Sequence, residues 1–172
     1  SDNPYSNKLI IDTAKDTMPD VLFRQEYLAE FVDNAAIFEN ITELACMDLQ
    51  SPIEGELYWV GVDIALKDDY TVITVMNAED EVVYFDRFNQ CTAPELKERI
   101  IKINDNWTPE VIKIEANNQG LPIIDDLEIT HGLNNIERFQ TTATSKQRIV
   151  NNLINAFSSK KIKVPNVDIY KS

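Results

Sequence analysis

Residues 58–76 read YWVGVDIALKDDYTVITVM: an apolar run that ends at Asp63, a polar turn, and a second apolar run. Runs of this length that are rich in β-branched and aromatic residues are typical of buried strands, so we predict strands over 58–64 and 70–76. A carboxylate at the end of a buried strand is costly unless a backbone cap or a bound cation compensates its charge. Asp63 is therefore the first candidate functional residue.

The residues that follow extend this hairpin into a mixed sheet. A third strand is predicted over 82–88, after a turn short enough to join antiparallel neighbours. The sequence Thr92-Ala93-Pro94-Glu95 indicates a helix start, and a fourth strand over 111–114 ends at Glu115. A strand, a helix and a strand in this order place the fourth strand parallel to an earlier one.

The remaining predicted elements complete the order β-β-β-α-β-α-β-α, an α/β fold with a mixed sheet and helices on both faces. They are a helix over 121–127, a strand over 136–141, a helix over 146–157 capped by Thr144-Ser145 with an apolar stripe, and short β-like pieces at 162–164 and 167–170. Amphipathic segments at 7–17 and 20–31 and a polar linker at 48–56 precede the sheet.

Composition predicts one soluble domain with its own core, since the chain has 172 residues of which 44% are hydrophobic. Cys46 and Cys91 are far apart and His131 is the single histidine, so we expect reduced thiols and neither disulfides nor a zinc site. The sequence has no run long enough to cross a bilayer and no secretory signal pattern. We therefore expect a cytosolic protein that is not exported.

The net charge of −13 argues against nucleic acid as a partner of the whole surface, because phosphate binding depends on Lys and Arg. The charge is unevenly distributed, however: residues 146–172 hold six of the 16 basic residues and only one of the 29 acids, Asp168. A polyanion is therefore expected to meet the C-terminal end. Alternatively, Lys160 and Lys161 belong to a solvated strand start.

Asp63 and Glu115 are each the first acid after a predicted buried strand, and these two strands are expected to be neighbours about 4.8 Å apart. Two carboxylates at one end of adjacent parallel strands can hold Mg²⁺ or Mn²⁺, and paired metals support phosphodiester hydrolysis. The alternative is that both acids cap turns. Asp69 is a possible additional acid, whereas Asp68, Asp125, Asp126 and His131 are expected at the surface.

Several short motifs resemble the nuclease domain of tailed-phage terminase large subunits. They are the segment FRQEYLAEF at 23–31, the strand ends Val62-Asp63 and Ile114-Glu115, and Thr144-Ser145-Lys146-Gln147-Arg148. The resemblance implies a ribonuclease H-like fold and a DNA endonuclease that cuts concatemeric double-stranded DNA with two divalent metals held by three acids. By position, Asp63 and Glu115 match the first and second acids. Lys146 and Arg148 match a basic helix start near the DNA, and Lys160 and Lys161 are further possible DNA contacts.

The resemblance also implies domain boundaries and partners. The chain lacks a glycine-rich phosphate loop, so we expect residues 1–18 to lead from a missing ATPase domain and residues 19–172 to form the nuclease domain. The third acid of the family lies in a His-Asp-Asp-like stretch downstream, and Asp168 alternates with apolar residues, so we expect a truncated domain with impaired cutting. Expected partners are double-stranded DNA, the ATPase domain, the portal and the small terminase subunit, in the cytoplasm of a bacterium infected by a phage or carrying a prophage.

Two other interpretations remain open from the sequence. An actin-like ATPase or sugar-kinase domain has a similar β-β-β-α-β opening, with Asp63, Asp69 and Thr71 in its turn, but such enzymes enclose nucleotide phosphates with glycine-rich turns and this chain has four glycines. A non-catalytic packaging or assembly module of the same fold is the second.

Overall fold

The computed structural model describes residue 38 and residues 40–65, 69–116 and 120–166. The predicted segments at 7–17, 20–31 and 167–170, and with them Asp168, lie outside the described residues. The chain divides into two compact units, which are described separately: Thr42–Thr142 with Ile162–Ser172, and Ser1–Ile41 with Ala143–Lys161. The first of these contains the sheet and is called the sheet unit below.

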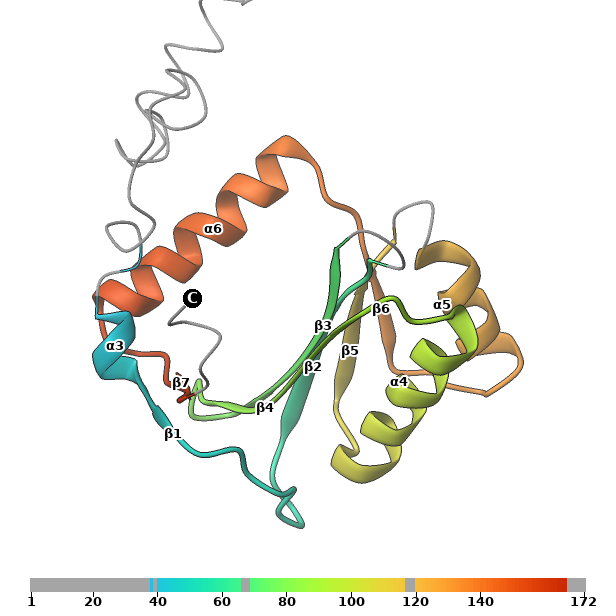
Figure 1. Ribbon diagram of the computed structural model, residues 1–172, viewed down its shortest axis with the longest axis horizontal. Helices are drawn as coiled ribbons and strands as arrows, with labels where there is room; N and C mark the ends of the chain where they lie inside the picture. The colour runs from blue at the N-terminus through green and yellow to red at the C-terminus, as the bar shows by residue number, and fades with distance from the viewer. Residues whose placement is uncertain (1–37, 39, 66–68, 117–119, 167–172) are drawn as a thin grey trace, which may run out of the picture. The chain divides into compact units, whose positions relative to one another are not determined.

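The predicted mixed sheet is confirmed, with five strands in the order β4-β3-β2-β5-β6 (Figure 1). Its strands are β2 (Tyr58–Asp63), β3 (Tyr70–Asn77), β4 (Val82–Asn89), β5 (Val111–Glu115) and β6 (Ile136–Phe139). The β2–β3 and β3–β4 pairs are antiparallel, and the β2–β5 and β5–β6 pairs are parallel. The fourth predicted strand thus lies parallel to the first and beside it, as the sequence predicted.

Two helices, α4 (Ala93–Trp107) and α5 (Gly120–Ile129), pack on one face of this sheet (Figure 1). Helix α4 begins with a capping box, in which Thr92 Oγ1 accepts a bond from the Glu95 amide and the Glu95 carboxylate accepts one from the Thr92 amide. Its buried residues Leu96, Ile100, Ile103 and Trp107 meet apolar residues of the sheet, including Ile73, Val75, Ile112 and Ile114. Helices α4 and α5 thus cover the same face, and this face holds the core.

The opposite face of the sheet is called the Asp63 face below. Along β2, the residues Tyr58, Val60 and Val62 are buried in the core, and the alternate residues Trp59, Gly61 and Asp63 lie on the other side. The strand register assigns further members to this face: Tyr70, Val72 and Thr74 of β3, Arg87 of β4, Lys113 and Glu115 of β5, and Glu137 and Phe139 of β6. It carries the charged residues Asp63, Arg87, Lys113, Glu115 and Glu137.

A second, two-stranded parallel sheet joins β1 (Ala45–Met47) to β7 (Val164–Pro165). The strand β1 and the preceding short helix α3 (Ile41–Leu44) were not predicted, because elements this short carry too few residues for a periodic pattern. The predicted linker at 48–56 contains no helix or strand, and its Gln50 amide donates to the Val83 carbonyl.

The other unit contains α6 (Ala143–Ser158), whose Phe157 is buried against Phe38 with ring centroids 5.4 Å apart. The predicted cap at Thr144-Ser145 is wrong, because the helix begins at Ala143 and both residues lie in its first turn. The predicted apolar stripe is also only partly buried, since Ile149 and Leu153 are exposed. Among the described residues, no helix has the length and apolar character needed to cross a membrane.

Candidate functional site

Asp63 and Glu115 end neighbouring parallel strands on the Asp63 face. The register pairs Val62 of β2 with Ile114 of β5, so the next residue of each strand, Asp63 and Glu115, follows at the same edge of the sheet. The preceding residues, Val62 and Ile114, point into the core. Because side chains alternate along a strand, both carboxylates point to the opposite face. The predicted juxtaposition of the two strand ends is therefore present in the structure.

The electrostatics of Asp63 show that these carboxylates are close. Burial, then the negative charge of Glu115 and a hydrogen bond between the two carboxyl groups, and finally the charge of Asp69 raise the pKa of Asp63. Each cause disfavours the ionised form of the side chain. A bound cation would offset the charges of both Glu115 and Asp69, which is why such a cluster favours a metal.

Asp69 lies just before β3 and is exposed. Its Oδ1 accepts a hydrogen bond of 2.7 Å from the backbone amide of Tyr70, which orients the carboxylate at the start of the strand. Within the described ranges, no three carboxylate, imidazole or thiol side chains converge closely enough to form a complete metal site. The described candidate metal ligands are thus the carboxylates of Asp63 and Glu115. Asp69 lies near enough for its negative charge to raise the pKa of Asp63.

A buried threonine holds the chain just beyond Asp63. Thr71 is fully buried, and its Oγ1 accepts a bond of 3.0 Å from the Ala65 amide and donates one of 2.8 Å to the Ala65 carbonyl. Just after Glu115, at the end of β5, the Ala116 amide donates to the Phe139 carbonyl at 2.7 Å. These bonds fix the backbone after each carboxylate, and so they fix the positions of both acids.

The predicted basic contacts fall in the other compact unit. Lys146 and Arg148 are exposed residues of α6, and Lys160 and Lys161 follow that helix. Lys160 adopts a positive φ of 54°, and the Lys161 amide donates to the Ala156 carbonyl, so these two residues close the helix. A strand follows, as in the alternative interpretation: Lys163 pairs with Glu81 and β7 begins at Val164. The role of the four predicted basic residues in DNA contact stays a prediction.

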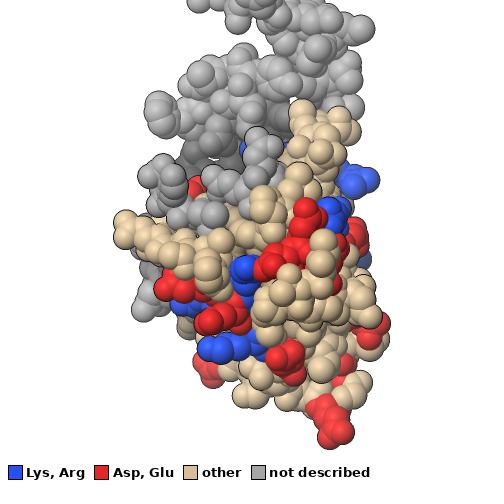
Figure 2. All heavy atoms as spheres, turned by 90° about the vertical axis from the view of Figure 1, so that its right-hand side faces the viewer, with Lys and Arg blue, Asp and Glu red and all other residues tan. Residues whose placement is uncertain are grey.

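Asp125 and His131 are exposed as predicted, Asp126 is half-buried, and Asp68 lies outside the described residues. Asp125 bonds Arg138, while Asp126 bonds Lys97 and Thr130 and lies 3.9 Å from His131 Nε2. Cys46 and Cys91 are both free thiols. Figure 2 shows the side of the sheet unit that bears α4 and α5, where acidic and basic side chains are interspersed. That side is therefore unsuited to hold a polyanion along its length.

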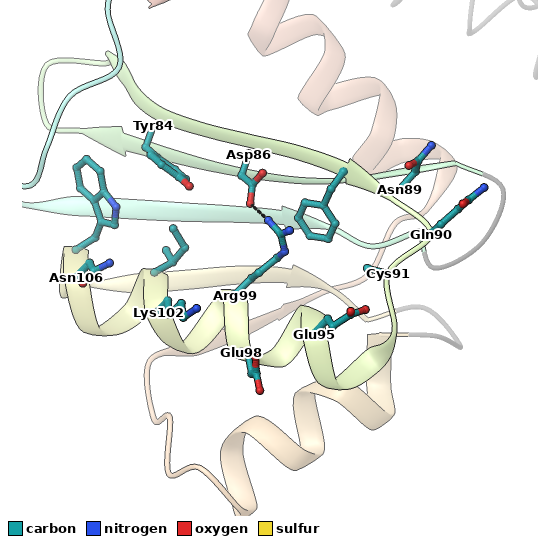
Figure 3. Close-up of a pocket in the computed structure, with 13 residues that line it drawn as sticks. Tyr84, Asp86, Asn89, Gln90, Cys91, Glu95, Glu98, Arg99, Lys102 and Asn106 are labelled. Carbon is teal, nitrogen blue, oxygen red and sulfur yellow. Dashed lines mark hydrogen bonds and ion pairs between the residues drawn. The ribbon is translucent and has the colours of Figure 1, made fainter.

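A pocket of about 580 Å³ opens between β4 and α4, on the core side of the sheet and away from the Asp63 face (Figure 3). Tyr84, Phe88 and Trp107 form its aromatic wall, and Asp86 accepts a bond of 2.6 Å from Arg99, which crosses the pocket from α4. Asp86 and Arg99 thus neutralise each other inside this pocket.

Sequence reasoning missed one feature of the Asp63 face, a stacked pair of side chains. The Arg87 guanidinium lies over the Tyr70 ring, 3.3 Å from its centroid. Only the register of β3 against β4 brings these residues together, so no local sequence signal indicates the pair.

Comparison with known proteins supports a specific relationship. The terminase large subunits of Thermus virus P23-45 and Thermus phage G20c are each 22% identical to the chain over 160 residues. The similarity covers 87% of the chain and 33% of each relative, so the chain spans about a third of their length. No protein-family model matches the chain.

Solved structures show the same fold. The large terminase nuclease of the thermophilic phage G20c with bound magnesium matches with a TM-score of 0.69 and 17% identity, over 77% of this chain and 75% of that one. The zinc-bound form matches with the same score, over 78% and 83%. The large terminase nuclease domain of Thermus phage P74-26 has a TM-score of 0.66 and 16% identity, over 77% and 73%.

The chain is homologous to the terminase large-subunit nuclease domain. The resemblance that the sequence motifs indicated is thereby confirmed, and so is the ribonuclease H-like fold. The terminase nuclease of phage G20c has been crystallised with magnesium and with zinc. In the present chain, the adjacent carboxylates of Asp63 and Glu115 are oxygen donors of the kind that hard divalent cations prefer.

Proposed function

We propose that this chain is the metal-dependent endonuclease domain of a phage DNA-packaging terminase. The observation that carries the proposal is the placement of Asp63 and Glu115 side by side at the ends of parallel strands, with the pKa of Asp63 raised. The homology to terminase nucleases supports the same assignment. The substrate is double-stranded DNA, which the enzyme cuts by phosphodiester hydrolysis.

Asp63 and Glu115 hold Mg²⁺ or Mn²⁺ in this proposal, and Asp69 is a possible additional ligand. The metal, when bound, polarises the phosphoryl oxygen and lowers the pKa of a bound water. Asp63 lies between the other two acids in this proposal, because its pKa is raised by the charges of both Glu115 and Asp69. Glu115 is held at the end of β5, where the following residue, Ala116, donates to the neighbouring strand. Thr71 holds the loop after Asp63, which keeps the first carboxylate in place without touching the substrate.

The wider assembly follows from the homology and is part of the proposal. We propose that residues 19–172 make up the nuclease domain and that residues 1–18 connect it to the ATPase domain of the same parent chain. The portal and the small terminase subunit are the further partners, and the reaction takes place in the cytoplasm of the bacterial host. Lys146, Arg148, Lys160 and Lys161 contribute DNA contacts from the other compact unit.

A plasmid-cleavage assay tests the activity. Supercoiled plasmid is incubated with the protein and Mn²⁺ or Mg²⁺, and relaxed and linear products are measured over time. We expect cleavage by the wild type, and a loss of at least about a hundredfold for Asp63→Asn and for Glu115→Gln. Glu98→Gln is the matched control, because Glu98 is an exposed acid of α4 on the other side of the sheet.

The outcomes separate the candidate functions. If Asp63→Asn and Glu115→Gln still cut the plasmid as the wild type does, the catalytic residues lie elsewhere in the protein. A plasmid that stays intact with the wild type, in the parent protein as well as in this chain, would favour a non-catalytic packaging module.

A further inference from the structure

Arg87 is a preorganised cation on the Asp63 face. It is an exposed residue of β4, and its guanidinium lies 3.3 Å from the centroid of the Tyr70 ring on β3. A stack of this kind restrains a long side chain and leaves the N–H groups at the rim of the guanidinium free to donate. Arg87 therefore presents its donors in a defined orientation.

The strand register places Arg87 in line with Asp63. Asp63 of β2 pairs with Val72 of β3, and Val72 pairs with Arg87 of β4, so all three residues share one row across the Asp63 face. Neighbouring strands are about 4.8 Å apart, so the backbones of Asp63 and Arg87 are about 10 Å apart. Successive nucleotides of one DNA strand advance about 3.4 Å along the helix axis, so this distance corresponds to a few nucleotides.

A β-bulge is responsible for this alignment. The pairing shifts by one residue between Val75 and Met76, where β3 meets the start of β4. Without the shift, Asp86 would lie opposite Val72 in place of Arg87, because a one-residue slip exchanges the faces of a strand. The bulge thus directs Asp86 toward Arg99 on the core side and Arg87 toward the Asp63 face.

The charge of Arg87 is available to a ligand. Most described basic residues of the sheet unit have a carboxylate within ion-pair distance: Lys97, Arg99, Lys113, Arg138 and Lys163. Among the Lys and Arg residues that the structure describes in this unit, only Arg87 and Lys102 have no such partner, and Lys102 lies on α4 beside the pocket. Arg87 is therefore the unpaired cation of the Asp63 face within the described residues.

We propose that Arg87, held over Tyr70, binds a DNA backbone phosphate a few nucleotides from the phosphate that is cut at Asp63 and Glu115. The inference rests on the proposed nuclease function and adds a substrate-positioning residue to it. Asp63, Asp69 and Glu115 repel a polyanion, and Arg87 supplies attraction on the same face. The planar guanidinium of Arg87 can donate two parallel hydrogen bonds to two oxygens of one phosphate, whereas a lysine ammonium cannot.

Duplex binding measured by fluorescence anisotropy tests the contact. The wild-type chain and its variants are titrated against a short fluorescein-labelled duplex in Ca²⁺, over a series of salt concentrations. For Arg87→Gln we expect binding weaker by roughly tenfold, because a charge-assisted hydrogen bond is lost. The slope of log affinity against log salt should also become shallower by about 0.9, the change expected for one phosphate contact.

Three further variants make the result specific to this contact. Arg87→Lys keeps the charge and should restore the salt slope but only part of the affinity. Tyr70→Leu removes the stacking surface and should weaken binding a few-fold with the salt slope retained. Lys102→Gln, the same change of charge on the α4 side, should bind as the wild type does.

The measurements distinguish this inference from the nuclease proposal. Stabilisation by Mn²⁺ in a thermal melt depends on the acids, so Arg87→Gln should retain it and Asp63→Asn should lose it. If Arg87→Gln and Lys102→Gln bind DNA equally well while cleavage and metal stabilisation are normal, the role of Arg87 is wrong and the nuclease assignment stands. A wild-type chain that binds no duplex would overturn both, and a melt of each variant without DNA verifies its folding.

Discussion

The carboxyl group of Asp63 lies beside that of Glu115 on the next parallel strand, so two like charges share one part of the Asp63 face. Without a cation, the folded state disfavours the ionised form of Asp63, and the pKa of this side chain is raised from its ordinary value of 3.8. A raised carboxyl pKa means that ionisation destabilises the folded chain. This relationship gives a prediction that needs no catalysis.

We predict that Asp63→Asn stabilises the metal-free protein at neutral pH. In urea titrations with EDTA, the variant should unfold at a higher urea concentration than the wild type. The advantage should vanish at a pH below 3.8, where Asp63 is protonated in both folded and unfolded chains, and it should grow as the pH rises through the raised pKa. A variant that is less stable than the wild type at neutral pH in EDTA would contradict the like-charge arrangement.

We predict that Asp63 is needed for metal binding. In calorimetric titrations with Mn²⁺ or Mg²⁺, Asp63→Ala should show an affinity lower by at least about tenfold, because one of the two adjacent carboxylates is lost. Glu98→Ala removes an exposed acid of α4 and should leave the titration unchanged. Equal binding by the wild type and Asp63→Ala would eliminate Asp63 as a ligand.

The sequence predicts much of the sheet because its strands are long enough to show their character. The segment 58–76 has two apolar runs with a polar turn, and its first run stops at an acid, so β2, β3 and the end position of Asp63 could all be inferred. Glu115 could be inferred in the same way, because α4 has a clear start signal and its crossover brings β5 parallel to β2.

The stacked pair Tyr70 and Arg87 could not be inferred from local patterns. Its formation depends on the bulge between Val75 and Met76, which changes the residue of β4 that lies opposite Val72. A bulge adds one residue to one strand and leaves the composition of both strands unchanged. A β-like piece at 162–164 was predicted near β7, but its partner β1 was missed because a strand of three residues carries no detectable alternation.

We predict that Thr71→Val destabilises the fold by about 1–3 kcal/mol, because the change leaves the amide and carbonyl of Ala65 without their buried partner. The variant should also bind Mn²⁺ more weakly, since Ala65 lies two residues after Asp63. The control is Thr74→Val on the same strand, where the hydroxyl makes only a long bond of 3.5 Å to the Gly61 carbonyl. Urea denaturation measures the first effect and calorimetry the second. Similar stability losses for both variants would show that the Ala65 bonds are not responsible.

The ion pair between Glu81 and Lys163 predicts a pH-dependent attachment of β7 to the turn between β3 and β4. Lys163 Nζ donates to Glu81 Oε1 at 2.7 Å, and Asn77 Nδ2 donates to Glu81 Oε2 at 3.2 Å. The hydrogen bond from Lys163 is the main cause that lowers the pKa of Glu81 below its ordinary value of 4.5. A lowered carboxyl pKa stabilises the fold above the ordinary value, and this contribution is lost as the pH falls through the folded-state pKa.

We therefore expect Glu81→Gln to be less stable than the wild type at neutral pH and to approach it as the pH falls below 4.5. Glu79→Gln is the matched control, because Glu79 lies in the same turn and only its backbone amide bonds Asn77. Urea denaturation at a series of pH values measures the difference. Hydrogen exchange should rise in Glu81→Gln at the amides of Lys163 and Asn166, which flank β7 and bond the carbonyls of Asp80 and Met47. A stability difference that stays constant from neutral to acid pH would show that the carboxylate charge of Glu81 does not hold β7 in place.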